Sequence, residues 1–195
     1  MFERDRFYLY VYPQMLDEYL AQLRQSCEQR HIPLISKETQ AFLVSWLERH
    51  HPKNVLEIWA AVWYSGIVIS QTIQQRWGRL TSFEISYPAY LEAMKNLQNA
   101  DCRNVVLYPF DINELSLEKF FSQKFDAAFI DAQKSQYGDY LQKIRQYLEP
   151  ENTLLLDDVI KYQNKLAWLY EFIEKKQINY KIFPTEPGDG VMLIE

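Results

Sequence analysis

Residues 125–134 read Phe-Asp-Ala-Ala-Phe-Ile-Asp-Ala-Gln-Lys, an apolar run of strand length that ends in the carboxylate of Asp131. Similar short apolar runs that reach an acid recur along the chain. Segments with helical periodicity separate them, for example Tyr87–Gln98 and Tyr137–Tyr147. This alternation predicts βαβ units and a parallel sheet, and so an α/β fold. The predicted parallel strands are Val55–Ile58, Leu80–Ile85, Val105–Phe110, Ala127–Ile130 and Thr153–Leu156.

The two ends of the chain depart from this alternation. Apolar residues at helical spacing predict two amphipathic helices before the first strand, over residues 13–30 and Thr39–Arg49. After a predicted helix over Gln163–Lys176, the runs Asn179–Phe183 and Val191–Ile194 read as a hairpin-like ending. We therefore expect a single domain over residues 1–195, with N-terminal helices in 1–50 and the core in 53–195.

An acid lies at or after the end of each predicted parallel strand. In an open α/β sheet these ends share one edge, and ligands bind outside it. Taken alone, each acid could equally be a helix N-cap or a solvated loop residue. Their recurrence on five strands favours a ligand with hydroxyl groups or a cation. The acids are Glu57, Glu84, Asp111, Asp131 and the pair Asp157 and Asp158.

Composition narrows the class of protein. A chain of 195 residues with 48% hydrophobic content can bury one substantial core. The net charge of −5 gives no overall electrostatic footprint for nucleic acid. No stretch approaches the roughly 20 apolar residues of a membrane span. The absence of such a stretch predicts no membrane contact. Because Cys27 and Cys102 are too few for a disulfide framework or a metal cluster, we expect a cytoplasmic protein.

Three motifs resemble those of S-adenosylmethionine-dependent, metal-dependent O-methyltransferases, similar to catechol and caffeoyl-coenzyme A O-methyltransferases and including bacterial tRNA hydroxyuridine methyltransferases. They are Val55-Leu-Glu-Ile58 with Tyr64-Ser65, residues 125–134 with Tyr137, and Leu156-Asp-Asp-Val159. The resemblance extends from Pro33 to Gly190, and Phe-Ile-Asp-Ala-x-Lys is its most specific part. It implies a Rossmann-like methyltransferase fold: a mostly parallel seven-stranded sheet with an antiparallel C-terminal strand and helices on both faces.

The resemblance also implies a site. Glu84 would accept hydrogen bonds from the ribose hydroxyls, Asp111 would lie near the adenine, and the loop after Glu57 would approach the methionine moiety. Asp131 and Lys134 would act in catalysis. A divalent cation, usually magnesium, would be held by Asp131, Asp157 and Asp158. The implied cofactor-binding residues are Glu57, Trp59, Ala61, Tyr64, Ser65, Glu84, Ile85, Asp111, Ile112 and Asp131.

The chemistry of these side chains suits such roles. A carboxylate offers several acceptor lone pairs and no donor, as two vicinal hydroxyls require. Magnesium prefers oxygen ligands, and a bound cation lowers the pKa of an acceptor hydroxyl. Lys134 could take the proton or stabilise the developing charge; the alternative is a solvated lysine at a helix start. For Asp157 and Asp158 the alternative is a helix cap.

Two departures from the family pattern matter. Asp158 stands where the family has asparagine, which keeps an oxygen ligand and adds a negative charge. The family's cofactor loop reads roughly Glu-Ile-Gly-x-x-x-Gly-Tyr-Ser, but Trp59 and Trp63 occupy both glycine positions here. Glycine is wanted there for positive φ and for close approach of the backbone to the ligand. We therefore expect an indole in or beside the cofactor crevice, and a small or closed cofactor site.

Two interpretations of these tryptophans stay open. In one, they block the pocket of a catalytically silent methyltransferase-like module. In the other, some are UGA codons, which certain bacterial lineages translate as glycine, so that the natural protein has glycine in place of Trp59 and Trp63. The chain has five tryptophans and five glycines, whereas average usage would give about fourteen glycines. Trp77, before Gly78, stands where the family turns on glycine.

The methyl acceptor and the assembly also stay open. A small phenol, a coenzyme A ester and a hydroxylated tRNA base all suit the resemblance. The aromatic segment Phe7–Tyr12 offers apolar surface for a partner subunit or for the chain's own sheet, and we favour a homodimer.

Overall fold

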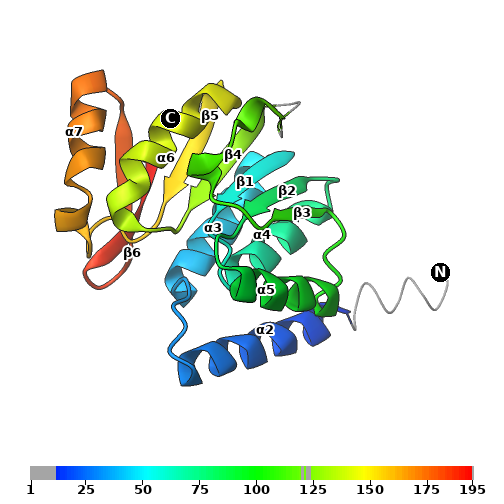
Figure 1. The fold of residues 1–195 in the computed structure, drawn as a ribbon. Coiled ribbons are helices and arrows are strands. Elements are labelled where there is room, and N and C mark those ends of the chain that lie inside the picture. The colour runs from blue at the N-terminus through cyan, green and yellow to red at the C-terminus, as the bar shows by residue number, and fades with distance from the viewer. Residues whose placement is uncertain (1–11, 120, 122–123, 195) are drawn as a thin grey trace.

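A seven-stranded sheet forms the centre of the protein in the computed structural model, which describes residues 12–119, 121 and 124–194 (Figure 1). The strands lie in the order β3-β2-β1-β4-β5-β7-β6. The first five run parallel, and β7 is antiparallel to both β5 and β6. This confirms the expected mostly parallel sheet with an antiparallel C-terminal strand. The strands are β1 (Asn54–Ile58), β2 (Arg79–Phe83), β3 (Val105–Tyr108), β4 (Phe125–Ile130), β5 (Leu148–Leu156), β6 (Tyr180–Glu186) and β7 (Asp189–Ile194).

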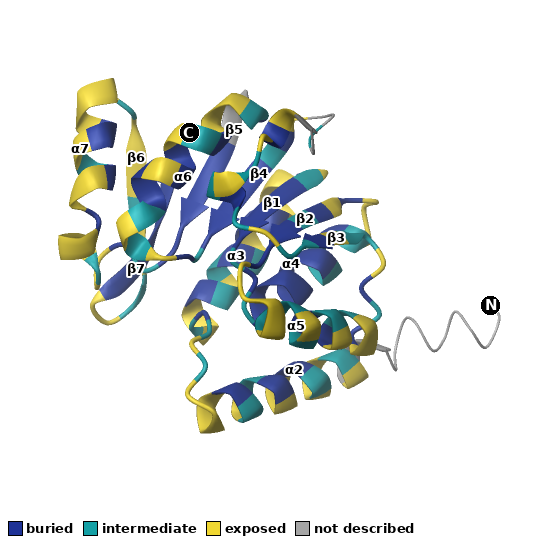
Figure 2. Cartoon of the chain, viewed as in Figure 1, coloured by how far each residue is buried: buried dark blue, intermediate teal, exposed yellow. Residues whose placement is uncertain are grey.

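Helices cover both faces of the sheet. Alternate strand residues point to opposite faces, so Val55 packs in one hydrophobic cluster and Leu56 in the other. The first cluster includes side chains of α2, α3, α4 and α5, and the second those of α6 and α7. In Figure 2 the central strands are buried, whereas the helices alternate buried and exposed residues. The helices are α2 (Tyr12–Gln29), α3 (Lys37–His50), α4 (Tyr64–Gln74), α5 (Tyr87–Asn99), α6 (Tyr137–Ile144) and α7 (Ala167–Lys176).

Short 3-10 turns fill several of the connections. They are η2 (Ile112–Glu114), η3 (Leu117–Lys119), η4 (Lys134–Gln136), η5 (Arg145–Tyr147) and η6 (Gln163–Lys165). Two predicted helices are shorter than expected because each contains one of these turns. The helix predicted over Tyr137–Tyr147 ends at Ile144, and the one predicted over Gln163–Lys176 begins at Ala167.

The N-terminal helices pack on the core. The Tyr19 hydroxyl of α2 donates to Asn96 of α5 at 2.8 Å, and Arg30 pairs with Glu92. Helix α3 also packs against α4. In the described part of the chain, every helix is too short or too polar to cross a membrane. The aromatic segment Phe7–Tyr12 lies outside the described residues except for Tyr12, which begins α2.

The C-terminal hairpin is longer than predicted. We expected a wide turn over residues 184–190, but β6 continues to Glu186 and β7 begins at Asp189. Pro184 fits within β6 because that strand lies at the edge of the sheet, where a missing backbone donor leaves no ladder bond unmade. Gly188, with a φ of 84°, makes the tight turn.

Candidate active site

The five parallel strands end at one level. Across the sheet, Tyr108 pairs with Phe83, Phe83 with Ile58, Ile58 with Ile130, and Ile130 with Leu156. Each of these is the last residue of its strand. The loops that follow therefore leave the same edge, and the predicted acids lie on or just before these loops.

A lysine joins two of the acids. The Lys134 ammonium lies 2.7 Å from Asp131 Oδ1 and 2.8 Å from Asp158 Oδ2. Burial opposes the charge on Lys134, but the negative charges of Asp131 and Asp158 outweigh it and raise the pKa of the lysine. Asp158 has a φ of 61°, a conformation that aspartate and asparagine adopt more readily than most residues. The site therefore holds a charged ammonium between two carboxylates.

Tyr137 connects this cluster to the sheet. Its ring is fully buried, and its oxygen accepts hydrogen bonds from Lys134 Nζ at 2.9 Å and from the Ala132 N–H at 3.3 Å. The phenol proton can be donated to the carbonyl of Ile130 or of Asp157. Burial raises the pKa of Tyr137 well above its ordinary value, which keeps it a donor. No role was predicted for Tyr137, although its three-residue spacing from Lys134 was a usable signal.

Asp157 has a different environment from its acidic neighbours. It is 4% exposed, and its Oδ1 accepts a hydrogen bond from Thr39 Oγ1 of α3 at 3.2 Å. Burial, followed by repulsion from Asp131 and Asp158, raises the pKa of Asp157 well above its ordinary value. This carboxyl group is therefore bound by helix α3 at the carboxyl edge of the sheet.

The acids fit a cation as a pair. Asp131 and Asp158 both contact one ammonium, so their carboxylates are close enough to share a cation. Within the described residues, no group of three His, Cys, Asp or Glu side chains is arranged to hold a metal. Two carboxylates suffice for magnesium when water and substrate oxygens complete its shell. Asp157 as a third ligand stays a prediction.

Glu57 is buried beneath the loop that follows β1. It is 1% exposed, and its carboxylate accepts hydrogen bonds from Ser65 Oγ at 2.6 Å, Ser82 Oγ at 2.6 Å and Trp63 Nε1 at 3.1 Å. Burial raises the pKa of Glu57 to about 7, and the three hydrogen bonds only partly offset this. The protein itself satisfies both oxygens, so Glu57 holds the loop and α4 in place.

Glu84 also binds this loop. It is 1% exposed, and its two oxygens accept the backbone N–H groups of Ala61 and Ser86, each at 2.6 Å. Burial raises the pKa of Glu84, against the effect of these hydrogen bonds. Each carboxylate oxygen retains further acceptor capacity, so the predicted contact with ribose hydroxyls remains a prediction.

The loop from 59 to 63 is held in an unusual backbone conformation. Trp59, Ala61 and Trp63 have φ values of 75°, 45° and 77°. The N–H groups of Trp59 and Ala60 both donate to the Phe83 carbonyl at 3.0 Å. Trp63 is fully buried, whereas Trp59 is half-buried and lines the cavity that contains Asp131. The expectation of an indole beside the crevice is confirmed.

A cavity of about 660 Å³ lies over the acid–lysine cluster. Of the predicted site residues, this cavity is lined by Trp59, Ala61, Tyr64, Ser65, Asp131, Lys134, Asp157 and Asp158. Its remaining wall includes Tyr162 and Lys165, which sequence analysis did not select. This cavity is open, because Trp63 packs into the core. The expectation of a small or closed cofactor site stays a prediction.

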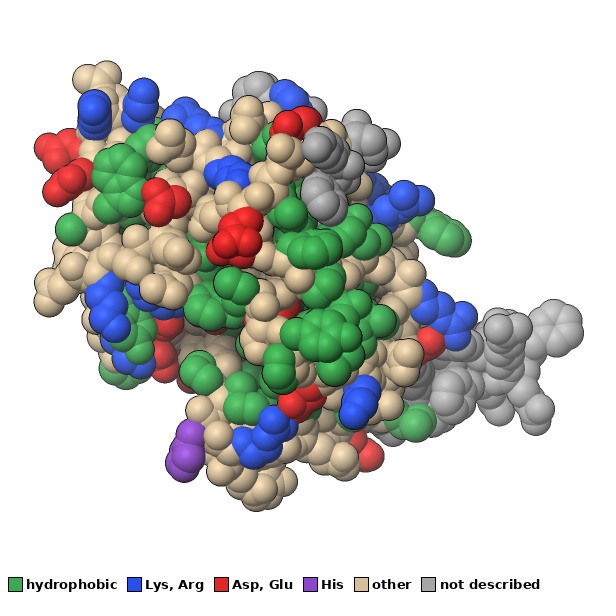
Figure 3. Space-filling view, viewed as in Figure 1, with side chains coloured by type: hydrophobic (Ala, Val, Ile, Leu, Met, Phe, Trp, Pro, Cys, Tyr) green, Lys and Arg blue, Asp and Glu red, His purple; other side chains and the backbone are tan. Residues whose placement is uncertain are grey.

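A smaller pocket of about 130 Å³ lies on the other side of Trp59. Ile85, Asp111 and Ile112 line it, together with Phe110, and Asp111 also caps η2 by accepting the Asn113 N–H at 2.8 Å. Ile85 and Phe110 are exposed, and the face of the molecule in Figure 3 has hydrophobic side chains gathered near its centre. Apolar walls beside an acid suit a flat ring with polar edges.

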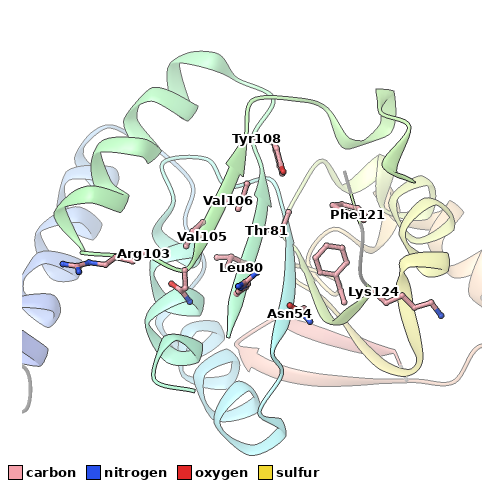
Figure 4. Close-up of a pocket in the computed structure, with 12 residues that line it drawn as sticks. Asn54, Leu80, Thr81, Arg103, Val105, Val106, Tyr108, Phe121 and Lys124 are labelled. Atoms are coloured by element: carbon pink, nitrogen blue, oxygen red, sulfur yellow. The ribbon is translucent and has the colours of Figure 1, made fainter. Parts of the chain in front are cut away.

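A third pocket, of about 410 Å³, extends along the sheet from the amino ends of β1 to β4. Its lining includes Asn54, Arg79, Val105 and Phe125, the first residues of β1, β2, β3 and β4. In Figure 4, Thr81, Val106 and Tyr108 lie along the sheet, with Phe121 and Lys124 across from them. The described residues that line this pocket include no acid. Because ligands bind at the carboxyl ends of such sheets, we place the site in the 660 Å³ cavity.

Comparison with known proteins bears on this site. The sequence model of one family, described as O-methyltransferase, matches residues 11–181. Among similar solved structures is the O-methyltransferase from Bacillus cereus in complex with SAH, which is 20% identical, with 91% of this chain and 90% of that one covered and a TM-score of 0.77.

Two further structures share the fold. The O-methyltransferase TomG from Streptomyces achromogenes, involved in tomaymycin synthesis and solved with SAM, is 20% identical, with 100% and 98% covered and a TM-score of 0.76. A candidate caffeoyl-CoA O-methyltransferase from Staphylococcus aureus is 17% identical, with 90% and 92% covered and a TM-score of 0.79. These likenesses confirm the Rossmann-like methyltransferase fold.

Proposed function

Because this chain belongs to the O-methyltransferase family, we propose that it transfers the methyl group of S-adenosylmethionine to a hydroxyl oxygen that lies next to a second oxygen donor. The observation that carries this proposal is the ammonium of Lys134 held between Asp131 and Asp158 in a cavity of about 660 Å³. This cluster lies at the strand ends, beside the loop that follows β1.

We assign the acceptor chemistry to that cluster. The acceptor hydroxyl gives its proton to a carboxylate of the pair, and its oxygen attacks the methyl carbon as the carbon–sulfur bond breaks and S-adenosylhomocysteine leaves. Lys134, charged by its two acidic neighbours, stabilises the oxyanion that develops. Of the two roles considered for Lys134, charge stabilisation fits better than proton removal.

A divalent cation is part of the proposal. Bound by Asp131 and Asp158, magnesium would lower the pKa of the acceptor hydroxyl. The fit rests on two converging carboxylates with hard oxygen donors.

We assign cofactor binding to the other half of the edge. Glu84 would accept the ribose hydroxyls, and the small pocket lined by Ile85, Asp111 and Ile112 would take the adenine. Ser65 and Tyr64, which line the large cavity next to Trp59, would contact the methionine end. The cofactor would then extend past Trp59, which lines both pockets.

Charge at the rim favours an anionic acceptor. The ammonium groups of Lys161 and Lys165 lie 5.4 Å and 5.0 Å from the centre of the Tyr162 ring, which lines the cavity. Unlike Lys134, neither forms an ion pair with a carboxylate in the described part of the chain. A coenzyme A ester or a tRNA nucleotide carries phosphate that these lysines could bind, and a small neutral phenol does not.

The test has a binding arm and an activity arm. If the chain binds cofactor, S-adenosylhomocysteine at 100 times its Kd should add about 2.7 kcal/mol to the free energy of unfolding. Methyl transfer from labelled S-adenosylmethionine is then measured with a catechol, a coenzyme A ester and a hydroxylated tRNA, with magnesium and with a chelator. An Asp131→Ala variant, folded by circular dichroism, is the control for each acceptor. Binding without transfer to any acceptor would contradict the enzyme.

One observation favours a second candidate, a catalytically silent module. Both family glycine positions in the cofactor loop carry tryptophan, and Trp63 fills space in the core next to Glu57. The absence of any stabilisation by S-adenosylhomocysteine would favour this module over the enzyme.

We also propose that the protein forms a homodimer. The support is the aromatic segment Phe7–Tyr12, whose side chains offer apolar surface for a partner subunit. Light scattering of the full chain and of a chain that begins at Tyr12 tests it, because a dimer built on this segment becomes a monomer when the segment is removed.

A further inference from the structure

Three of the five tryptophans lie in the left-handed region of backbone conformation, and we infer that the natural protein carries glycine at these three positions. Trp59, Trp63 and Trp77 have φ values of 75°, 77° and 62°. The other two, Trp46 and Trp168, lie within α3 and α7. The tryptophans thus divide into a helical pair and a left-handed trio.

Tryptophan is an unfavourable residue at such positions. In the left-handed region Cβ approaches the backbone, and a bulky side chain there is an outlier, whereas glycine adopts the region freely. Only one glycine in the described part of the chain, Gly188, has a positive φ. Most of the left-handed positions described are therefore occupied by residues other than glycine, and three of them by tryptophan, the largest residue.

Trp77 shows the conflict most clearly. The Trp77 N–H donates to the Gln74 carbonyl and the Gly78 N–H to the Ile73 carbonyl, so Trp77 is the left-handed residue of a Schellman motif that ends α4. That position is usually glycine. Its side chain is 92% exposed, so no packing compensates for the strained backbone.

Other helix ends in the chain provide a contrast. The same pair of hydrogen bonds ends α2 at His31, α5 at Asp101 and α7 at Gln177, all left-handed. These are polar residues. The fourth such end has a tryptophan that is 92% exposed. This contrast indicates that the natural residue at position 77 is not tryptophan.

Trp59 and Trp63 stand in the loop after β1 with Ala61 between them. Three left-handed residues within five require a backbone that glycine makes without strain. The Trp63 indole does find a place in the core, where its N–H bonds Glu57, so packing accommodates the side chain while the backbone conformation still disfavours it. The demand for glycine comes from φ and needs no ligand.

One genetic mechanism explains which tryptophans are affected. Some bacterial lineages translate UGA as glycine, whereas another code reads UGA as tryptophan; UGG is tryptophan in both. Translation under the wrong code would replace some glycines by tryptophan and leave true tryptophans unchanged. It would also lower the glycine count, which is five here. The inference predicts UGA at codons 59, 63 and 77 and UGG at codons 46 and 168.

Mass spectrometry of the protein from its natural source is the direct test. Trypsin releases residues 54–76, which contain both loop positions and no internal lysine or arginine. We expect glycine at positions 59 and 63 of this peptide, so that its mass is lower than that of the tryptophan form, and UGA at both codons. UGG at codons 59 and 63, or a peptide that contains two tryptophans, overturns the inference.

A consequence for the cofactor site rests on the proposed function. Expressed with Trp59→Gly and Trp63→Gly, the protein should bind S-adenosylmethionine about 5- to 150-fold more tightly by calorimetry than the tryptophan form. Trp77→Gly is the matched control: it removes a left-handed tryptophan away from the cavity and should leave affinity unchanged. Glycine in the natural peptide without gain in binding would leave the inference standing and contradict the proposed function.

Discussion

The acids on the two halves of the sheet edge are held in different ways. After β4 and β5, Asp131 and Asp158 share the ammonium of Lys134. Glu57 on β1 and Glu84 directly after β2 accept hydrogen bonds only from hydroxyl, indole and backbone N–H groups. The ammonium of Lys134 neutralises the first pair of acids, whereas neutral hydrogen-bond donors satisfy the second pair.

This difference shows which part of the chain depends on the loop after β1. Glu57 and Glu84 both bind loop residues, Trp63 and Ala61, and burial raises the pKa of each acid. The acid–lysine cluster binds no loop atom in the described structure. Changes in the loop should therefore alter cofactor binding and stability, whereas changes at Lys134 should alter chemistry.

The largest effect is expected at Lys134. Lys134→Met removes the ammonium that stabilises the oxyanion and should lower kcat about 10²- to 10³-fold. Cofactor affinity should stay unchanged, because the loop and its acids are untouched. Steady-state kinetics and calorimetry in the Trp59→Gly, Trp63→Gly background measure both.

The matched control is Lys176→Met, at the exposed end of α7. It removes one lysine far from the cavity and should leave kcat as it is. Equal activity in the Lys134 and Lys176 variants would remove Lys134 from the mechanism.

The second prediction concerns the pH dependence of stability at Glu57. Its pKa in the folded protein, about 7, lies above the ordinary value of 4.5, so the folded state holds a proton that the unfolded chain releases. Stability is therefore lost as pH rises between these values. Glu57→Gln cannot ionise, and it should gain roughly 3 kcal/mol relative to the parent between about pH 4 and pH 8.

Urea unfolding at the two pH values measures that gain. Glu171→Gln, on an exposed position of α7, is the control: it keeps Glu57, so it should follow the parent at both pH values and show no such gain. If the free energies of unfolding of the parent and of Glu57→Gln change equally with pH, the pKa of Glu57 is not raised in the folded protein, and the prediction is wrong.

Much of the strand edge could be predicted because its signals are local. An apolar run that ends in an acid reports both strand and edge, and the three-residue spacing of Asp131 and Lys134 brings the two side chains together in one turn. The demand for glycine at 59 and 63 was also local, and the φ values agree with it.

What could not be predicted depends on contacts distant in sequence. Thr39 donates a hydrogen bond to Asp157, which is 118 residues away in the sequence. This contact gives Asp157 an environment different from that of Asp131 and Asp158, the pair that binds Lys134. Likewise, Trp63 turns into the core against Ser82 and Glu57, so it leaves the large cavity open. The direction of a side chain in a left-handed turn follows from the packing around it, and no periodicity reports that.

A third, smaller effect tests where the Trp63 indole lies. Gly66, in the first turn of α4, faces it, and a Cβ at Gly66 would collide with the indole ring. Gly66→Ala should therefore cost about 1–3 kcal/mol in the tryptophan chain. In a Trp63→Gly background it should instead stabilise by up to about 1 kcal/mol, since alanine favours a helix over glycine.

Chemical unfolding of the four proteins gives the coupling between the two positions. The same effect of Gly66→Ala in both backgrounds would show that the indole does not occupy this space.

The smallest effect is expected at Asp111, which separates a structural role from a binding role on the cofactor side. Its Oδ1 accepts the Asn113 N–H and caps η2. Asp111→Asn keeps an oxygen acceptor and should leave stability unchanged, whereas Asp111→Ala should lose about 1 kcal/mol. If the carboxylate also contacts the adenine, Asp111→Asn weakens S-adenosylhomocysteine binding a few-fold at unchanged stability, measured by calorimetry beside thermal unfolding. Parent-like binding by Asp111→Asn would assign the residue to the cap alone, and cofactor recognition on this side would then rest on Glu84 and the apolar walls of the small pocket.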